Sequence, residues 1–344
     1  MLPSIQVCLE LVRQTVHPHV HRLRIHEIKR SATPAVIYRL TLEKPSSAVS
    51  GGPPASLILK CVEAEWPDDP NGPDREPNFY ATLADQLDLA GPAIFFAGCD
   101  PTSRQRLVLM EDLSGYHLPN VRHIWKAEEA RCFLRTYARL HSQGAALLTN
   151  GLEPPGWLFP RHERDLQIDR LASLHVDLVQ AKFWPEIPRF VELLTWIEKK
   201  LVEFSRSPKT LLHNDVFPPN IALPRDLERG EAILLDWEMV GLGPAELDLS
   251  FLFMQPFQSS RELDRRSMLE YYWHERQRWD GVPADASERV DRQLIADAVW
   301  ALWLVRVAHR VWRSPFPAGS LEAQYWQAMA GVLHSKLTEL ADGV

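Results

Sequence analysis

The sequence predicts an α+β fold of two lobes, because strand patterns and helical patterns lie in separate parts of the chain. Residues 1–113 carry short runs of β-branched and aromatic residues with partial alternation, which is typical of half-buried strands. Residues 114–344 carry long segments in which apolar residues recur at helical spacing. A chain of 344 residues is long enough for both. We therefore expect a small antiparallel sheet carrying one helix, joined near residues 111–114 to a larger, mainly helical lobe.

The first lobe contains several strand patterns. They lie at residues 20–43 (two strands around the turn SATPA), 56–64, 93–100 and 104–113. The Pro- and Asp-rich stretch at 65–77 is interpreted as a loop. A helix is expected to follow it over residues 78–89. Lys60 is notable because it places a charge inside an otherwise apolar strand.

The second lobe contains three clear helical patterns, at residues 127–147, 188–205 and 289–312. The last of these is apolar on nearly all sides, which predicts a central buried helix. Two further strands are expected between the helices, at residues 220–224 and 232–238. No fixed-period repeat interrupts this pattern.

The bulk composition excludes several classes of function. A net charge of −7 disfavours nucleic-acid binding, which needs a basic face. No run reaches the roughly 18 apolar residues of a membrane span. The four cysteines lie far apart without a CxxC pair, so we expect reduced thiols and neither a disulfide frame nor a zinc site. A cytoplasmic protein is expected, as a monomer or a homodimer, with a small molecule as its partner.

The stretch HNDVFPPN at residues 213–220 has the spacing of a catalytic loop. Asp215 and Asn220 lie on this loop, and Asp236 ends an apolar run sixteen residues later. Such a set suits phosphoryl transfer, in which one carboxylate accepts a hydroxyl proton while an amide and a second carboxylate hold magnesium. The alternative interpretation is a loop of turn-forming residues followed by an acid at the end of a strand.

These motifs resemble those of a known family. HNDVFPPN and LLDWE are similar to the H-G-D-x-x-x-x-N and I-D-W-E motifs of the aminoglycoside phosphotransferase/choline kinase-like family of small-molecule kinases, and the resemblance spans roughly residues 25–255. It implies a two-lobed protein-kinase-like fold in which Asp215 is the base and Asn220 and Asp236 bind the metal. Supporting roles around this site are implied for His213, Glu238 and Asp248.

The same resemblance implies a nucleotide site in the first lobe. Lys60 would contact the phosphates, with Glu76 as its ion-pair partner. The alternatives are a lysine that reaches solvent from an edge strand and an acid at a helix N-terminus. The backbone of the segment LVLMEDL would bind adenine, through residues near Met110, Glu111 and Leu113.

The turn expected to cover the nucleotide departs from the family pattern. It reads KRSATPAVIYRL and lacks glycine, so fewer backbone N–H groups can approach the phosphates closely. Pro34 removes one donor outright. The hydroxyls of Ser31 and Thr33 are expected to compensate.

Together these features predict an ATP- and Mg²⁺-dependent kinase for the hydroxyl group of a small molecule. The acceptor stays open among aminoglycosides, choline or ethanolamine, sugars and natural-product alcohols, and GTP stays an alternative to ATP. Three tryptophans could in principle form an aromatic cage for a quaternary ammonium, but their helical spacing favours core packing; they are Trp300, Trp303 and Trp312. The rival function is a catalytically silent nucleotide-binding module that acts through a partner.

Overall fold

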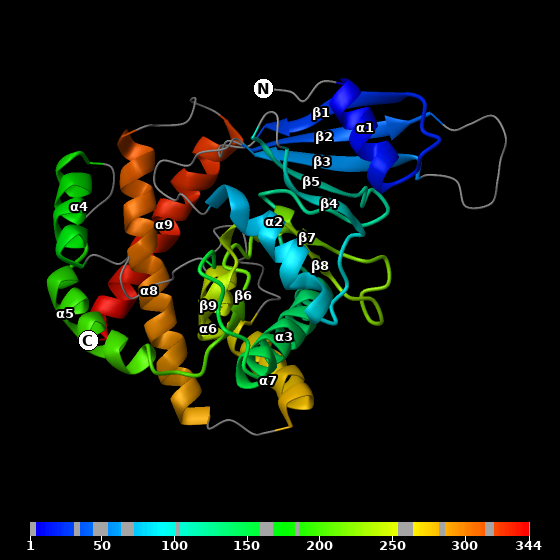
Figure 1. The fold of residues 1–344 in the computed structure, drawn as a ribbon. Helices are drawn as coiled ribbons and strands as arrows, with labels where there is room; N and C mark the ends of the chain where they lie inside the picture. The colour runs from blue at the N-terminus through cyan, green and yellow to red at the C-terminus, as the bar shows by residue number, and fades with distance from the viewer. Residues whose placement is uncertain are drawn as a thin grey trace. The chain divides into compact units, whose positions relative to one another are not determined.

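The computed structural model describes residues 5–30, 35–43, 54–62, 72–100, 104–158, 168–182, 186–253, 264–281, 286–313 and 320–343. The chain divides into two compact units, whose elements Figure 1 shows in chain order. The first unit comprises Met1–His117, Pro155–Phe159 and Ile233–Met239. The second comprises Leu118–Pro154, Pro160–Ala232 and Val240–Val344.

A five-stranded antiparallel sheet forms the body of the first unit. Its strands follow the order β1-β2-β3-β5-β4 (Figure 1), so β3 lies at the centre with a partner on each side. The strands are β1 (Leu23–Arg30), β2 (Ala35–Leu42), β3 (Ser56–Val62), β4 (Ile94–Cys99) and β5 (Arg106–Glu111). The predicted α+β class and its antiparallel sheet are therefore confirmed.

Alternation along β3 separates its two faces. Leu57 and Leu59 point into an apolar cluster, and Lys60 points to the opposite face, because successive side chains of a strand alternate. The cluster also includes buried residues of an N-terminal helix, α1 (Ile5–Thr15), which packs against β1. This helix was not predicted, although Cys8, Leu9 and Val12 lie at helical spacing and are buried together.

The helix after β3 does not begin where the sequence predicted. α2 spans Gly72–Thr82, and a short 3₁₀ turn follows at Ala84–Gln86, so the predicted bounds of 78–89 were wrong at both ends. Prolines had marked the stretch as a loop, but the first turn of a helix tolerates proline because its N–H groups have no partner within the helix. Pro77 lies further inside and removes one helical hydrogen bond. Glu76 therefore lies within the helix rather than before it.

The second unit is mainly helical. Its helices are α3 (Ala127–Thr149), α4 (Ile168–Gln180), α5 (Phe190–Phe204), α6 (Glu246–Phe253), α7 (Arg265–Asp280), α8 (Ala286–Arg313) and α9 (Leu321–Asp342). The three helices predicted here are confirmed by α3, α5 and α8. Trp300 on α8 is 2% exposed and stacks on Phe251 of α6, so it belongs to the core. Among the described residues, no helix combines the length and the apolar character that crossing a bilayer requires.

Short strands support the loops between these helices. In the second unit, β6 (Thr210–Leu212) pairs antiparallel with β9 (Gly241–Gly243) and leads directly into the HNDVFPPN stretch. β7 (Ile221–Ala222) follows that stretch. In the first unit, β8 (Ile233–Leu234) leads to Asp236. Each of the two candidate carboxylates, Asp215 and Asp236, therefore follows a buried strand.

Candidate active site

A buried lysine gathers three carboxylates in the first unit. Nζ of Lys60 lies 2.6 Å from Oε2 of Glu76, 2.5 Å from Oδ1 of Asp236 and 3.5 Å from Oε2 of Glu238. Lys60 is 4% exposed and Glu76 3% exposed, so the lysine does not reach solvent from the edge of the sheet. The structure thus brings together four residues that the sequence singled out.

The charges in this cluster do not balance. Burial lowers the pKa of Lys60, but the carboxylates of Asp236, Glu76 and Glu238 outweigh it and raise this pKa well above its usual value. Burial raises the pKa of Glu76, and the nearby ammonium of Lys60 offsets only part of that rise. Three carboxylates face one ammonium here, and carboxylate oxygens are the donors that a hard divalent cation prefers. Asp236, whose side chain is 31% exposed, is the carboxylate of this cluster whose chemistry and accessibility fit Mg²⁺.

Helix α2 holds the segment that follows Asp236. Oε1 of Glu76 accepts a hydrogen bond from the backbone N–H of Trp237 at 3.4 Å, and the Trp237 ring stacks on Phe79 with centroids 3.9 Å apart. Arg75 is fully buried and donates to the carbonyl of Glu238 at 2.8 Å. Sequence reasoning missed Arg75 because it placed this residue in a proline-rich loop.

The backbone at Asp236 adopts a conformation that few residues accept. Its φ is +65°, in the left-handed region, where Asp and Asn are enriched among residues other than glycine. Asn214, in the HNDVFPPN stretch, has φ of +66°. Both candidate loops thus use a short polar side chain at the point where the chain turns sharply after a strand.

The residues of the expected adenine segment lie at the end of β5. Met110 and Leu113 are buried, whereas Glu111 is exposed. The N–H of Glu111 is already used by the carbonyl of Ala93 at 2.9 Å. Within the part of the chain that the structure describes, the N–H of Leu113 donates to no acceptor. Ser31 and Thr33, the predicted phosphate-contacting hydroxyls, lie outside the described residues.

In the second unit, Asn220 fixes the carboxylate of Asp215. Nδ2 of Asn220 donates to Oδ2 of Asp215 at 2.7 Å and to its backbone oxygen at 3.1 Å. The 3₁₀ turn Pro218–Asn220 allows this, because proline fixes φ and brings a residue five positions later back to the acid. These two bonds use the nitrogen of the amide and leave its oxygen, Oδ1, as an acceptor.

Asp248 on α6 anchors the start of the same loop. Its carboxylate accepts hydrogen bonds from the backbone N–H groups of His213 at 2.9 Å and Asn214 at 2.8 Å. Burial raises the pKa of Asp248, but hydrogen bonds, first of all that from His141, outweigh it and hold this pKa below its usual value. Nδ1 of His213 accepts a hydrogen bond from the backbone N–H of Asp215 at 3.3 Å. The loop backbone is therefore held by an ionised carboxylate.

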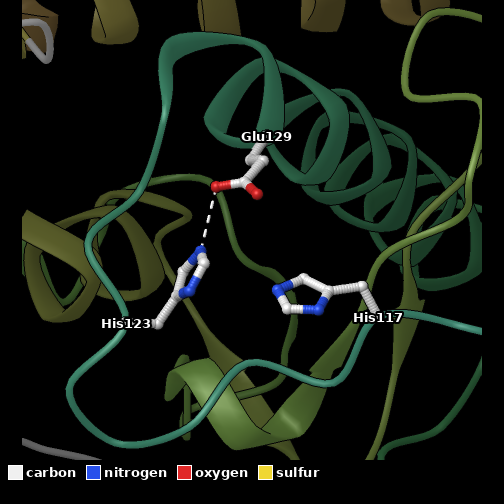
Figure 2. Close-up of side chains that lie close together, drawn as sticks. All are labelled: His117, His123 and Glu129. Carbon is white, nitrogen blue, oxygen red and sulfur yellow. Dashed lines mark hydrogen bonds and ion pairs between the residues drawn. The ribbon is translucent and has the colours of Figure 1, made fainter.

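A further pair of titratable side chains lies at the start of α3: His123 precedes the helix, and Glu129 lies in its first turn. Nε2 of His123 lies 2.9 Å from Oε2 of Glu129 (Figure 2), and the same oxygen accepts from the backbone N–H of Lys126 at 3.0 Å. Glu129 thus closes a capping box at the start of the helix. These contacts give the pair a role in starting α3.

Several solved structures share the fold of this chain. Structures that resemble the chain include a protein from Ralstonia eutropha JMP134 provisionally assigned as an aminoglycoside phosphotransferase, with 17% identity, coverage of 99% of this chain and 98% of that one, and a TM-score of 0.68. Choline kinase from Cryptosporidium parvum Iowa II is 11% identical, with coverage of 99% of this chain and 97% of that one and a TM-score of 0.58. An amicoumacin kinase in complex with AMP-PNP, Ca²⁺ and its ligand is 15% identical, with coverage of 99% of this chain and 94% of that one and a TM-score of 0.58. At these identities the likeness shows the fold.

The family itself follows from the sequence profile. A search of curated proteins found no match. The profile of the phosphotransferase enzyme family, by contrast, matches residues 42–282 and includes both candidate loops. Because that match covers more than half of the chain, the resemblance of its motifs is confirmed, and the chain belongs to the phosphotransferase enzyme family.

Proposed function

We propose that this phosphotransferase moves the γ-phosphoryl group of ATP to a hydroxyl group of a small molecule in a Mg²⁺-dependent reaction. The observation that carries the proposal is the loop of the second unit, in which Asn220 orients the carboxylate of Asp215 and Asp248 fixes the backbone before it. A carboxylate held in this way is suited to accept one proton from an alcohol.

Asp215 is the general base in this proposal. The acceptor oxygen forms a bond to the γ-phosphorus while the bond from that phosphorus to the bridging β,γ-oxygen breaks, and Asp215 takes the hydroxyl proton. Asp215 is partly exposed, so its carboxylate is accessible to a substrate. His213 does not take this role, because its Nδ1 accepts the N–H of Asp215 and braces the loop.

Asn220 and Asp236 are the proposed metal ligands. The amide oxygen of Asn220 and the carboxylate of Asp236 are both hard donors. When bound, Mg²⁺ would supply positive charge against the phosphates of the nucleotide. The excess of carboxylates around Lys60 supports a cation in this reaction, and an amicoumacin kinase of similar fold was solved with AMP-PNP and Ca²⁺.

Lys60 is the proposed phosphate ligand and Glu76 orients it. Lys60 lies on β3 and its carboxylate partner Glu76 lies on α2, so both members of the ion pair are carried by regular elements and the ammonium presents a fixed charge. The free N–H of Leu113, among the described residues, suits an acceptor on the adenine ring. Ser31 and Thr33 stay predicted phosphate contacts, and GTP stays the alternative nucleotide.

The acceptor is proposed by class, as an alcohol on an aminoglycoside, choline or ethanolamine, a sugar or another natural product. A panel of such compounds tested for ADP release with and without Mg²⁺ examines the proposal directly. Acceptor-stimulated ADP release that requires Mg²⁺ supports it. Thermal stabilisation by ATP without any turnover across the panel would favour the silent nucleotide-binding module instead.

A further inference from the structure

A buried chain of hydrogen bonds continues from Asp248 into the helices of the second unit. Nε2 of His141, on α3, lies 3.1 Å from Oδ2 of Asp248, and Nδ1 lies 2.7 Å from the hydroxyl of Tyr272 on α7. Nη1 of Arg276 lies 3.4 Å from the same hydroxyl. His141 and Tyr272 are fully buried, and Asp248 is 1% exposed. The chain therefore lies within the core, away from solvent.

The chemistry of these groups sets the direction of each hydrogen bond. Asp248 is ionised and accepts only, so Nε2 of His141 must carry a hydrogen and donate to it. Burial lowers the pKa of His141 more than Asp248 raises it, so the ring is neutral and Nδ1 is an acceptor. The hydroxyl of Tyr272 therefore donates to Nδ1 and accepts from Arg276. All the donors point from a cation toward the carboxylate that holds the loop.

The far end of the chain is tied back to its start. Nε of Arg276 donates to Asp280 at 2.5 Å, and the hydroxyl of Ser142, which follows His141 in α3, donates to the other oxygen of the Asp280 carboxylate. The network thus closes between α3 and α7, which pack along each other (Figure 1). A closed network in a low dielectric strengthens each of its bonds.

We propose that Tyr272 is a positioning residue for phosphoryl transfer, which sets the Asp215 loop through His141 and the carboxylate of Asp248. This inference rests on the proposed role of Asp215 as the base. One carboxylate receives two consecutive backbone N–H groups of the loop, at His213 and Asn214. Any rotation of that carboxylate therefore shifts both peptide groups before Asp215, and small displacements of a catalytic group cost much of its rate.

Two variants separate the bonds of this chain. Tyr272→Phe removes only the hydroxyl and leaves Nδ1 of His141 as a buried acceptor without its donor. His141→Gln keeps an amide donor for Asp248 and has no acceptor at the position of Nδ1, which receives the hydroxyl of Tyr272. The matched control is Tyr137→Phe: Tyr137 is also buried, its ring centroid lies 5.7 Å from that of His141, and its hydroxyl has no hydrogen-bond partner among the described residues.

Native-state hydrogen exchange reads the loop without requiring any activity. With Tyr272→Phe, the amides of His213 and Asn214 are expected to exchange at least about 10-fold faster, because loosening their shared acceptor opens the loop locally. His141→Gln is expected to raise these rates less, since Asp248 keeps a donor. Tyr137→Phe is expected to leave them unchanged. Unaltered exchange at both amides in a folded Tyr272→Phe protein would overturn the inference.

Kinetics separate positioning from stability. With the acceptor found in the panel above, Tyr272→Phe is expected to lower kcat by about 10- to 100-fold, the range for a misplaced catalytic group, while KM for the nucleotide changes less than about 2-fold. A variant that loses thermal stability but keeps kcat assigns the chain a structural role and rejects the inference. Full activity of Asp215→Asn would instead reject the proposed base, whatever the exchange rates show.

Discussion

The side-chain amide of Asn220 lies 2.7 Å from the carboxylate of Asp215. One residue therefore orients the proposed base with its nitrogen and leaves its oxygen for the proposed cation. This division of one amide between two tasks explains why the two residues stand five positions apart on a turn that prolines hold. It also means that changes at these two positions have separable effects.

Asp215→Asn is expected to lower kcat by about 10²–10⁴-fold, the usual range for loss of a general base. An asparagine keeps a carbonyl oxygen for the amide of Asn220, so the loop should keep its shape. Nucleotide affinity is expected to stay within about 2-fold, because this side chain acts on the hydroxyl. Steady-state kinetics and calorimetric titration with the nucleotide measure both quantities. Near-normal turnover would remove Asp215 from the mechanism.

Asp236→Asn tests the metal assignment. Asparagine accepts the positive φ at this position, so the backbone turn should survive while the charge is lost. The Mg²⁺-dependent part of nucleotide affinity is expected to disappear together with turnover, whereas Asp215→Asn should keep it. Titration calorimetry with ATP, with and without Mg²⁺, is the measurement. An unchanged Mg²⁺ dependence would show that another residue binds the cation.

Lys60→Met is expected to abolish turnover and to destabilise the protein. It leaves Glu76 buried without its ammonium partner, and breaking a buried pair in this way costs about 3–5 kcal/mol. The double variant with Glu76→Gln should recover much of the free energy of unfolding but none of the activity. Urea denaturation and an activity assay on the same preparations measure these effects.

A lysine on the surface provides the control for that comparison. Lys199 is exposed on α5, so Lys199→Met removes a charge of the same kind without breaking a buried pair. Its stability and turnover should match those of the wild type. An active Lys60→Met protein would contradict the role of Lys60 in binding phosphate.

The stability of the second unit is expected to fall at acidic pH. Burial lowers the pKa of His141, and the nearby charge of Arg276 lowers it further. The carboxylates of Asp248 and Glu246 raise this pKa, but by less, so the net shift is downward. Because its folded-state pKa lies below its unfolded value of about 6.5, the neutral ring adds stability above that pH and loses it as pH falls through the folded pKa. His141→Gln does not titrate, so its free energy of unfolding should vary less between pH 7 and pH 4.5. Equal pH slopes would contradict this.

The sequence predicted several local parts of this protein, although it missed α1 and misplaced α2. Alternation found the strands, helical spacing found α3, α5 and α8, and the spacing of Asp215 and Asn220 marked a loop whose residues do bond to each other. These signals are local, because each depends on neighbours within a few residues. Lys60 was recognisable because a charge within an apolar strand needs a partner.

The contacts that depend on distant segments were not predictable in the same way. Arg75 lay in a stretch that prolines made resemble a loop, although it bonds to the carbonyl of Glu238, 163 residues later. His141 and Tyr272 are separated by 131 residues, and no local sequence pattern around either residue predicts their hydrogen bond. Only the packing of α3 on α7 brings these two side chains together.

The position of Lys60 on β3 determines which part of its ion pair can move. β3 is the central strand of the sheet and is hydrogen-bonded on both sides, with Lys60 opposite Ile37 on β2 and opposite Val108 on β5. Central strands open only when a whole sheet unfolds, whereas a helix that lies on a sheet can shift by small steps. A change in the backbone separation of Lys60 and Glu76 is therefore expected to come from a displacement of α2, with the backbone of β3 staying in place.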